Sequence, residues 1–172
     1  MSIAIRPASA ADAVAIAQIH NEGVAERIAT FRAEPRTPDD VALAIESERP
    51  MLVAERDDVV VAWAAIGPYD DANDWYAGVG EATVYVTRNA RRSGAGLALL
   101  EALERAGEDA GLYKLIAKIF DTNEPSLRLF ERAGYRVVGT HRRHGRLDGE
   151  WKDVVVLEKL IGPAARLLDR RG

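Results

Sequence analysis

The sequence contains no cysteine among its 172 residues. Disulfide scaffolds, thiolate metal sites and cysteine nucleophiles are therefore excluded. It also has no apolar run near the roughly 18 residues that a membrane span needs. Its first residues lack the basic start and apolar core of a signal peptide. We therefore expect a soluble, cytoplasmic protein with no membrane partner.

Neither sign of charge is in large excess. The chain carries 27 acidic and 23 basic residues, which gives a formal net charge of -4. A nucleic-acid-binding protein usually carries a clustered basic excess, so this balance argues against a nucleic-acid partner. Apolar residues, in contrast, make up 48% of the chain. That share is enough for one domain with a sizeable core.

Hydrophobic periodicity predicts an α/β fold, with a mixed sheet covered by helices on both faces. Strands are expected at 3–6, 51–55, 59–66, 82–87, 113–120, 135–140 and 153–159. Helices are expected after the capping residues Ser9 and Thr37, and at 96–110 and 124–133. Residues 68–80 are typical of a long surface loop. We expect one domain over 1–162 and a solvated C-terminal tail over 163–172.

The most informative segment joins the strand at 82–87 to the helix at 96–110. It reads Arg91-Arg92-Ser93-Gly94-Ala95-Gly96-Leu97, a basic turn with two glycines. Backbone N–H groups of such a turn can point inward, and a helix N-terminus adds positive potential, so the segment suits a phosphate or pyrophosphate. It is neither a P-loop nor a dinucleotide fingerprint. The alternative is a tight connection with solvated arginines.

Several spaced motifs resemble the GCN5-related N-acetyltransferase (GNAT) superfamily. They are Arg91-x-x-Gly94-x-Gly96 after an alternating strand, Asn123-x-x-Ser126, and Gly134-Tyr135. Segments 30–38, 81–86 and 149–154 further resemble the phosphinothricin N-acetyltransferase branch, which includes arsinothricin and methionine sulfone or sulfoximine acetyltransferases. The resemblance covers residues 3–160. It implies a single-domain GNAT fold whose mixed, twisted sheet has two diverging parallel central strands.

The resemblance also implies acetyl-CoA as the acyl donor, with no metal and no protein nucleophile. The donor contacts that it implies are Val84, Tyr85, Val86, Arg91, Arg92, Ser93, Gly94, Ala95, Gly96, Leu97, Asn123 and Ser126. A strand N–H near Val84 or Tyr85 would polarise the thioester carbonyl. Glu81 stands where this branch carries its proposed base, acting directly or through a water. The alternative for Glu81 is a solvent-exposed carboxylate at a strand start.

For the acceptor, the resemblance points to Phe31, Arg32, Tyr69, Trp75 and Thr83. The chain departs from the branch in its acidic loop at 69–76, where relatives tend to carry basic residues. This departure argues against the usual recognition of a phosphinate or arsonate. Arg32 and Arg36 could supply the missing positive charge, with plain solvation as the alternative.

A second departure lies at Phe130, where the branch usually has histidine. A phenyl ring cannot protonate the departing thiolate, so that role is vacant or falls to water, Tyr135 or another group. Phe130 itself is expected to pack in the core beneath the coenzyme.

The remaining aromatic and histidine residues have plainer interpretations. The segment 141–144 holds two histidines, but its arginines would repel a metal ion, so a solvated basic hairpin is expected. We expect His20 on a helix face and Trp63 in the core of a buried strand.

The sequence thus predicts an acetyl-CoA-dependent N-acetyltransferase that acts on the primary amine of a small amino-acid-like compound. A detoxifying role toward a toxic glutamate analogue and a homodimeric assembly are further expectations. Two alternatives stay open: a protein or peptide N-acetyltransferase, and a non-catalytic acyl-CoA-binding sensor. Phe31, Tyr69 and Trp75 favour a closed aromatic pocket over a peptide groove. Phe130 keeps the sensor open, and Glu81 weighs against it.

Overall fold

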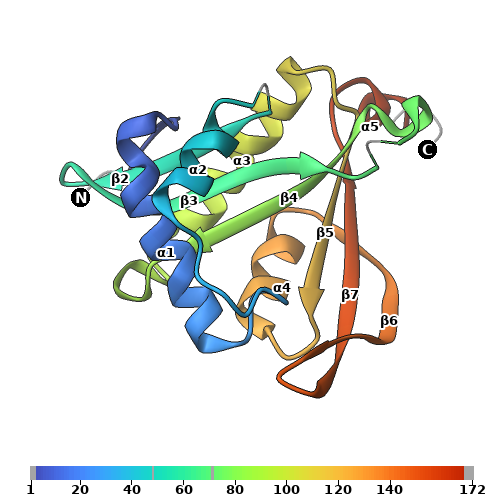
Figure 1. Ribbon diagram of the computed structural model, residues 1–172. Coiled ribbons are helices and arrows are strands. Elements are labelled where there is room, and N and C mark those ends of the chain that lie inside the picture. The colour runs from blue at the N-terminus through green and yellow to red at the C-terminus, as the bar shows by residue number, and fades with distance from the viewer. Residues whose placement is uncertain (1–2, 48, 71, 169–172) are drawn as a thin grey trace.

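A computed structural model describes residues 3–47, 49–70 and 72–168 of the chain. Its centre is one seven-stranded sheet in the order β1-β2-β3-β4-β5-β7-β6 (Figure 1). The strands are β1 (Ala4–Pro7), β2 (Met51–Arg56), β3 (Val59–Pro68), β4 (Val79–Val86), β5 (Lys114–Phe120), β6 (Arg136–Leu147) and β7 (Glu150–Leu160). The neighbours β4 and β5 run parallel, and the other neighbouring pairs are antiparallel. The predicted mixed sheet is confirmed.

Helices cover both faces of this sheet (Figure 1). On one face lie α1 (Ala13–Glu26) and α2 (Pro38–Ile45), and on the other α3 (Ala95–Asp109) and α4 (Glu124–Arg132). The helix α5 (Gly162–Leu168) and the single turns η1 (Ala10–Asp12), η2 (Asp74–Tyr76) and η3 (Arg88–Ala90) complete the described elements. None of the described helices combines the length and the apolar character that crossing a membrane requires.

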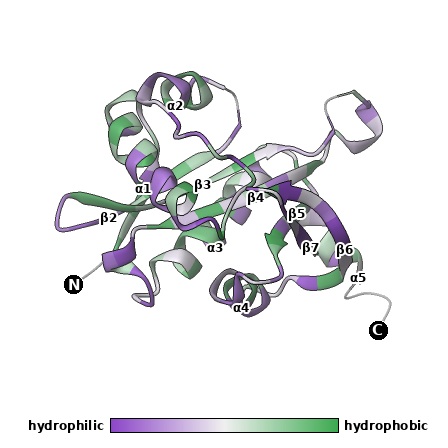
Figure 2. Ribbon diagram, turned by 60° about the horizontal axis from the view of Figure 1, so that its bottom comes forward, coloured by the Kyte–Doolittle hydropathy of each residue, from purple (hydrophilic) through white to green (hydrophobic). Residues whose placement is uncertain are grey.

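Each face of the sheet has its own apolar core. On one face the predicted stripe of α3 turns inward, and Leu99, Leu100 and Leu103 are fully buried in a cluster that includes residues of β3 and β5. On the other face Ile16 of α1 shares a separate cluster with Trp63 of β3. Each fully buried side chain of this size contributes about 1.5–3 kcal/mol. Figure 2 shows the matching pattern, with hydrophobic colour along the central strands.

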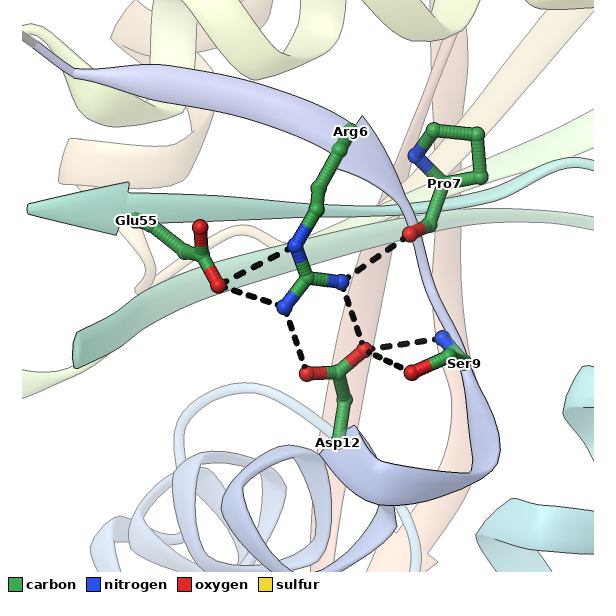
Figure 3. A network of polar contacts seen from close by, with 5 residues as sticks. All are labelled: Arg6, Pro7, Ser9, Asp12 and Glu55. Atoms are coloured by element: carbon green, nitrogen blue, oxygen red, sulfur yellow. Dashed lines mark hydrogen bonds and ion pairs between the residues drawn. The ribbon is translucent and has the colours of Figure 1, made fainter. Parts of the chain in front are cut away.

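The turn that leads from β1 into α1 is held by a polar network (Figure 3). Two guanidinium nitrogens of Arg6 each donate to an Asp12 carboxylate oxygen at 2.8 Å, and Arg6 Nε donates to Glu55 of β2 at 3.1 Å. The N–H and hydroxyl of Ser9 also donate to Asp12. The predicted Ser9–Asp12 signature therefore works mainly through the Asp12 carboxylate, which fixes the start of α1 against the sheet edge.

The start of α2 follows the predicted capping pattern. Asp40 N–H donates to Thr37 Oγ1 at 3.1 Å, and Thr37 N–H donates back to Asp40 at 3.0 Å, with Pro38 in the first helical position. This reciprocal pair satisfies two backbone donors that a helix start otherwise leaves without partners. The capping box also fixes where the segment between α1 and α2 ends.

The parallel strands β4 and β5 pair only at their beginnings. Their register runs from Val79 opposite Lys114 to Glu81 opposite Ile116, and beyond that point the strands separate. Figure 1 shows β4 and β5 spreading apart toward their arrowheads. The diverging pair that the family resemblance implied is therefore present in the sheet.

Three segments differ from the sequence-based expectations. The strand β4 begins at Val79 inside the expected loop, and β6 runs to Leu147 rather than ending at 140. Residues 141–144 are exposed and belong to the β6–β7 hairpin, as expected of a solvated basic hairpin. Residues 162–168 form the helix α5 within the stretch expected to be a solvated tail, and residues 169–172 lie outside the described part of the chain. Gly80 explains the first difference: a Cβ there would lie 2.3 Å from Ile66 of β3, so this glycine permits close packing rather than a loop.

Candidate active site

A cleft of about 510 Å³ lies where β4 and β5 separate. Its walls come from β4, β5, the start of α4, the segment between α1 and α2, and the β6–β7 pair. These elements lie far apart in the sequence, and the divergence of two neighbouring strands brings them together. A gap of this kind leaves strand peptide groups available to an extended ligand.

The backbone of β4 alternates between its two neighbours. Thr87 N–H, just after the strand, donates to Val61 of β3 at 2.9 Å. In an antiparallel pair the N–H and C=O of one residue point to the same side, and successive residues alternate. The peptide groups of Tyr85 therefore point toward β3, whereas those of Val84 and Val86 point into the gap. Of the strand contacts expected from sequence, Val84 and Val86 have the better-directed backbone.

Glu81 is the last residue of β4 that pairs with β5. Its carboxylate accepts a hydrogen bond from Lys118 Nζ of β5 at 2.7 Å, and both side chains line the cleft. The two side chains are 29% and 39% exposed, so water reaches the pair. A hydrated carboxylate at the opening between two strands can take up a proton directly or through a water. Lys118 was not among the residues expected from sequence.

The turn after β4 gives its two glycines different roles. Gly94 has φ +88°, a conformation that L side chains rarely adopt, and α3 begins at the next residue. Gly96 lies inside α3, where a Cβ would come within 3.2 Å of Leu129 of α4 and 3.3 Å of Val86. Gly94 therefore shapes the turn, whereas Gly96 allows α3 to pack closely on its neighbours.

The start of α3 presents backbone donors. Ala98 N–H donates to Gly94 C=O at 3.1 Å and so closes the first turn. The N–H groups of Gly96 and Leu97 precede that hydrogen bond and belong to the donors that a helix start leaves open. Together with the helix dipole they form a suitable site for a phosphate group.

The two arginines of this turn differ in their contacts. Arg91 forms an ion pair with Glu26 of α1 at 2.8 Å, and Arg88 donates to the same carboxylate at 2.6 Å. Arg92 is exposed, has φ +61°, and has no ion pair within the described part of the chain. Arg91 therefore ties the turn to α1, and Arg92 remains the arginine available to an anionic ligand.

The start of α4 brings Asn123 and Ser126 into the cleft. Asn123 Oδ1 accepts from Ser126 N–H at 3.3 Å and caps the helix, and both residues line the cleft. Phe130 is 2% exposed and packs edge-on against Tyr135, with ring centroids 4.9 Å apart. Burial raises the pKa of the Tyr135 hydroxyl well above its usual range, and Tyr135 does not line the cleft. Tyr135 is therefore a poor proton donor for a leaving group there.

On the acceptor side, Phe31 and Thr83 line the cleft together with Glu81. Phe31 lies edge-on to Phe120 of β5, with centroids 4.7 Å apart. A Cβ at Gly145 of β6 would lie 2.7 Å from the Phe31 ring, so glycine allows β6 to close on this aromatic wall.

The other expected acceptor residues lie away from this wall. Trp75 is 80% exposed, Arg32 is exposed, and neither lines the cleft. Tyr69 stands near the opening, with its ring centroid 5.9 Å from Lys118 Nζ and its edge against Tyr76. Among the expected acceptor residues, the structure brings only Phe31 and Thr83 into contact with the cleft.

One cleft residue comes from the segment expected to be a basic hairpin. His144 of β6 lines the cleft and stacks on His141 with centroids 4.5 Å apart. Sequence reasoning missed His144 because polar residues on both faces of an edge strand give no alternation to follow. Within the described residues, no three metal-ligating side chains gather closely enough to hold an ion.

The model of the acetyltransferase (GNAT) family matches residues 17–135. The chain therefore belongs to the GNAT family of acetyltransferases.

Curated relatives and a solved structure extend this match over most of the chain. Phosphinothricin N-acetyltransferase of Streptomyces viridochromogenes is 39% identical over 158 residues, covering 88% of this chain and 84% of its own. L-methionine sulfoximine/L-methionine sulfone acetyltransferase of Pseudomonas aeruginosa is 30% identical, covering 95% and 97%. A phosphinothricin acetyltransferase from Sinorhizobium meliloti, solved in complex with AcCoA, has a TM-score of 0.89 at 26% identity, covering 96% and 92%. The chain is thus an N-acetyltransferase of this family.

Proposed function

We propose that this enzyme transfers an acetyl group from acetyl-CoA to the primary amine of a small amino-acid-like acceptor of the phosphinothricin or methionine sulfoximine type. The observation that carries the proposal is the position of Glu81. It ends the paired part of β4 and lines the cleft that the two separating strands create. The named relatives, which act on such acceptors, support the same substrate class.

The donor would lie along β4 and end at the turn before α3. The inward-directed peptide groups of Val84 and Val86 can bond the amides of a pantetheine arm. The open N–H groups at the start of α3, together with Arg92, suit the diphosphate. Asn123 and Ser126 line the same cleft from α4. These residues suit the amides and the negative charge of acetyl-CoA as a co-substrate.

Glu81 would accept the proton that the acceptor ammonium loses, directly or through a water. The amine then forms a bond to the thioester carbonyl carbon, the bond from that carbon to sulfur breaks, and the second proton of the nitrogen passes to the departing thiolate or to solvent water. The N–H of Val84, directed into the gap, is placed to stabilise the oxyanion that forms in between. A thiol of ordinary pKa, about 8.5, leaves readily as thiolate. Phe130 therefore does not prevent the reaction.

The test is release of free CoA thiol from acetyl-CoA by the purified protein with a panel of amines. The panel contains phosphinothricin, arsinothricin, methionine sulfoximine and ordinary amino acids. We expect turnover with at least one acceptor and none with the same acceptor already blocked at nitrogen. If acetyl-CoA binds and no amine on the panel is acetylated, the proposed acceptor class is wrong.

Acetylation of a toxic glutamate analogue would give the enzyme a detoxifying role.

The homodimer expected from the family resemblance stays a prediction. Trp151 of β7, 50% exposed and stacked beneath Arg146 at 4.1 Å, offers an aromatic surface for a second copy. Sedimentation of the purified chain tests this assembly.

A further inference from the structure

Beside the cleft lies a second hollow of about 420 Å³, on the face of the sheet that α1 and α2 cover. We call it the α1–α2 pocket and define it by His20 of α1, Arg36 before α2, and Trp63 of β3. It shares Thr30, Thr83 and Tyr85 with the cleft. The two hollows therefore meet at Thr30 and at two residues of β4, the strand that carries Glu81.

The polar atoms that define the α1–α2 pocket are buried without hydrogen-bond partners. They are both ring nitrogens of His20, the indole nitrogen of Trp63 and Nε of Arg36. These atoms make up four of the six such atoms in the described part of the chain. His20 and Trp63 are only 6% and 2% exposed. Native structures rarely leave buried donors unpaired, so a cluster of them around a hollow points to a ligand.

Neighbouring side chains hold these donors in place. The rings of Trp63 and Tyr85 stack with centroids 5.1 Å apart and nearly parallel planes, and His20 lies 4.8 Å from Tyr85. The side-chain amide of Asn21 forms two hydrogen bonds with the backbone of Arg36. It donates to the Arg36 carbonyl at 2.9 Å and accepts from the Arg36 N–H at 2.8 Å. Arg36 also donates to the carbonyl of Asp40 at 3.3 Å, which leaves its Nε free. The donors are therefore fixed before any ligand arrives.

The α1–α2 pocket contains a guanidinium. Arg36 lines it, and no carboxylate does so among the described residues. Burial, followed by the charges of Arg36 and Arg32, lowers the pKa of His20 to about 4, so its ring is neutral near pH 7. A neutral imidazole still offers one N–H, as does the indole. Asp40 is the carboxylate that acts on Arg36 electrostatically, and it does not line the pocket. Neutral N–H donors beside a guanidinium suit an oxyanion.

We propose that the α1–α2 pocket binds an oxyanion of the acceptor, either its α-carboxylate or an acidic group of its side chain, while the acceptor amine reaches Glu81. This inference rests on the proposed function and names the recognition element of its substrate. Glu81 and Thr83 lie on the same face of β4, about 6.7 Å apart by strand geometry. The side-chain acid of one small amino acid can therefore lie beyond Thr83 while its amine contacts Glu81, whereas binding of the α-carboxylate requires the amine to reach Glu81 through a water.

The acidic loop at 69–76 contains no basic residue that could hold an anion of the acceptor. Asp70 is occupied within that loop, where it accepts from Ala72 N–H and from the Asn73 amide, each at 2.9 Å. In this proposal the positive charge comes instead from Arg36, in the segment before α2, and His20 of α1 contributes a neutral N–H.

The binding test uses glutarate, a dicarboxylate that has no amine, and the three indole N–H signals in a ¹⁵N spectrum. We expect glutarate to shift the Trp63 signal, assigned by its loss in Trp63→Phe, and to leave those of Trp75 and Trp151 in place. Neutral glutaramide should shift none of them. Arg36→Gln should abolish the glutarate shift, whereas Arg105→Gln, an exposed arginine on α3, should keep it. The proposal is overturned if glutarate does not shift the Trp63 signal, or if glutaramide shifts it equally.

The kinetic test separates the two possible oxyanions. Arg36→Gln should raise KM about tenfold or more, the factor that one charge-assisted hydrogen bond supplies, with kcat within roughly threefold. If the α-carboxylate binds, KM rises for phosphinothricin and for methionine sulfoximine but not for the carboxamide of the latter. If the side-chain acid binds, KM rises for phosphinothricin alone. Arg36→Lys, which keeps the charge, should restore part of the affinity.

The proposal is overturned if wild type and Arg36→Gln have equal KM values for phosphinothricin and for methionine sulfoximine. It is also overturned if Arg36→Gln raises KM for the carboxamide as much as for methionine sulfoximine itself. A wild-type enzyme that acetylates no member of the panel would instead contradict the proposed function. The glutarate titration still decides the α1–α2 pocket in that case, because it needs no turnover.

Discussion

The two faces of the sheet are covered in different ways. On the α3 face, Leu99, Leu100 and Leu103 fill a continuous apolar core. The two unpaired buried atoms there, in Glu104 and Tyr135, line neither hollow. The α1–α2 face has a smaller apolar cluster and keeps unpaired donors around an open pocket. We infer from this difference that the α3 face contributes more of the stability and that the α1–α2 face recognises the acceptor. The strand β4 belongs to the sheet between the two faces.

The largest effect should come from Glu81, which belongs to the strand between the two faces. Glu81→Gln keeps the shape but cannot accept the proton, so we expect kcat to fall about 10²–10³-fold with unchanged stability. The loss should be greatest at low pH, where unprotonated amine is scarcest. Thiol release measured across pH checks this. Lys118→Met, which removes the ion pair but keeps the carboxylate, is the comparator and should lose less activity. A rate profile in Glu81→Gln that matches wild type removes Glu81 as the base.

Leu103→Ala tests whether the α3 face carries stability alone. Leu103 is fully buried, so its truncation should cost about 2–5 kcal/mol through lost burial and the cavity left behind. Urea unfolding measures this cost, and KM for the acceptor should stay unchanged in the folded variant. Leu43→Ala on α2, at a side chain that is 69% exposed, should change stability by no more than about 0.5 kcal/mol. A raised acceptor KM in Leu103→Ala would break the division between the faces.

Asp12→Asn tests a polar network that, unlike the α1–α2 pocket, has its hydrogen bonds formed within the chain. Arg6 and Ser9 both donate to the Asp12 carboxylate (Figure 3). The hydrogen bonds from Arg6 lower the pKa of Asp12 from 3.8 to about 2. Asn keeps the shape but loses the charge, so unfolding should become easier by about 1.5–3 kcal/mol. This stabilisation is complete above pH 3.8 and is lost as the pH falls through 2. Urea titrations at pH 7 and pH 3 check both statements.

The control for Asp12 is Glu124→Gln. It removes an exposed i,i+4 ion pair with Arg128, which should change stability by less than about 1 kcal/mol. An equal cost for the two variants would mean that burial and network geometry add nothing at Asp12.

Elements with a strong local signal were predictable from the sequence. The stripe of α3 follows from leucines at helical spacing, and the start of α2 follows from Thr37 and Asp40. Gly80 misled the prediction, since glycine indicates a turn in sequence but here makes room for Ile66 against β4. The extension of β6 was missed because an exposed edge strand with polar residues on both faces has no period to detect.

The candidate site was predictable where short motifs carry it, including Asn123 and Ser126. The glycine turn and Glu81 lie in one stretch of sequence, so a motif can identify them. Lys118 meets Glu81 across 37 positions of sequence, and only the parallel register of β4 with β5 brings them together. The proximity of His20, Trp63 and Arg36 likewise depends on how α1 packs on β3, and a local sequence pattern does not encode that packing.

The smallest expected effect tests the unpaired donors directly through His20. Its pKa is lowered from 6.5 to about 4 by burial and by Arg36 and Arg32. The unfolded chain then takes up a proton that the folded chain refuses, so stability is full above pH 6.5 and declines as the pH falls toward 4. Between pH 6.5 and 5 the decline should be about 1–2 kcal/mol, measured as the difference between wild type and His20→Leu in urea unfolding. An oxyanion beside the ring favours its charged form and raises the folded pKa, so saturating glutarate should flatten this slope. A slope that is the same with and without glutarate would place the anion away from His20 and break the assignment of recognition to this face.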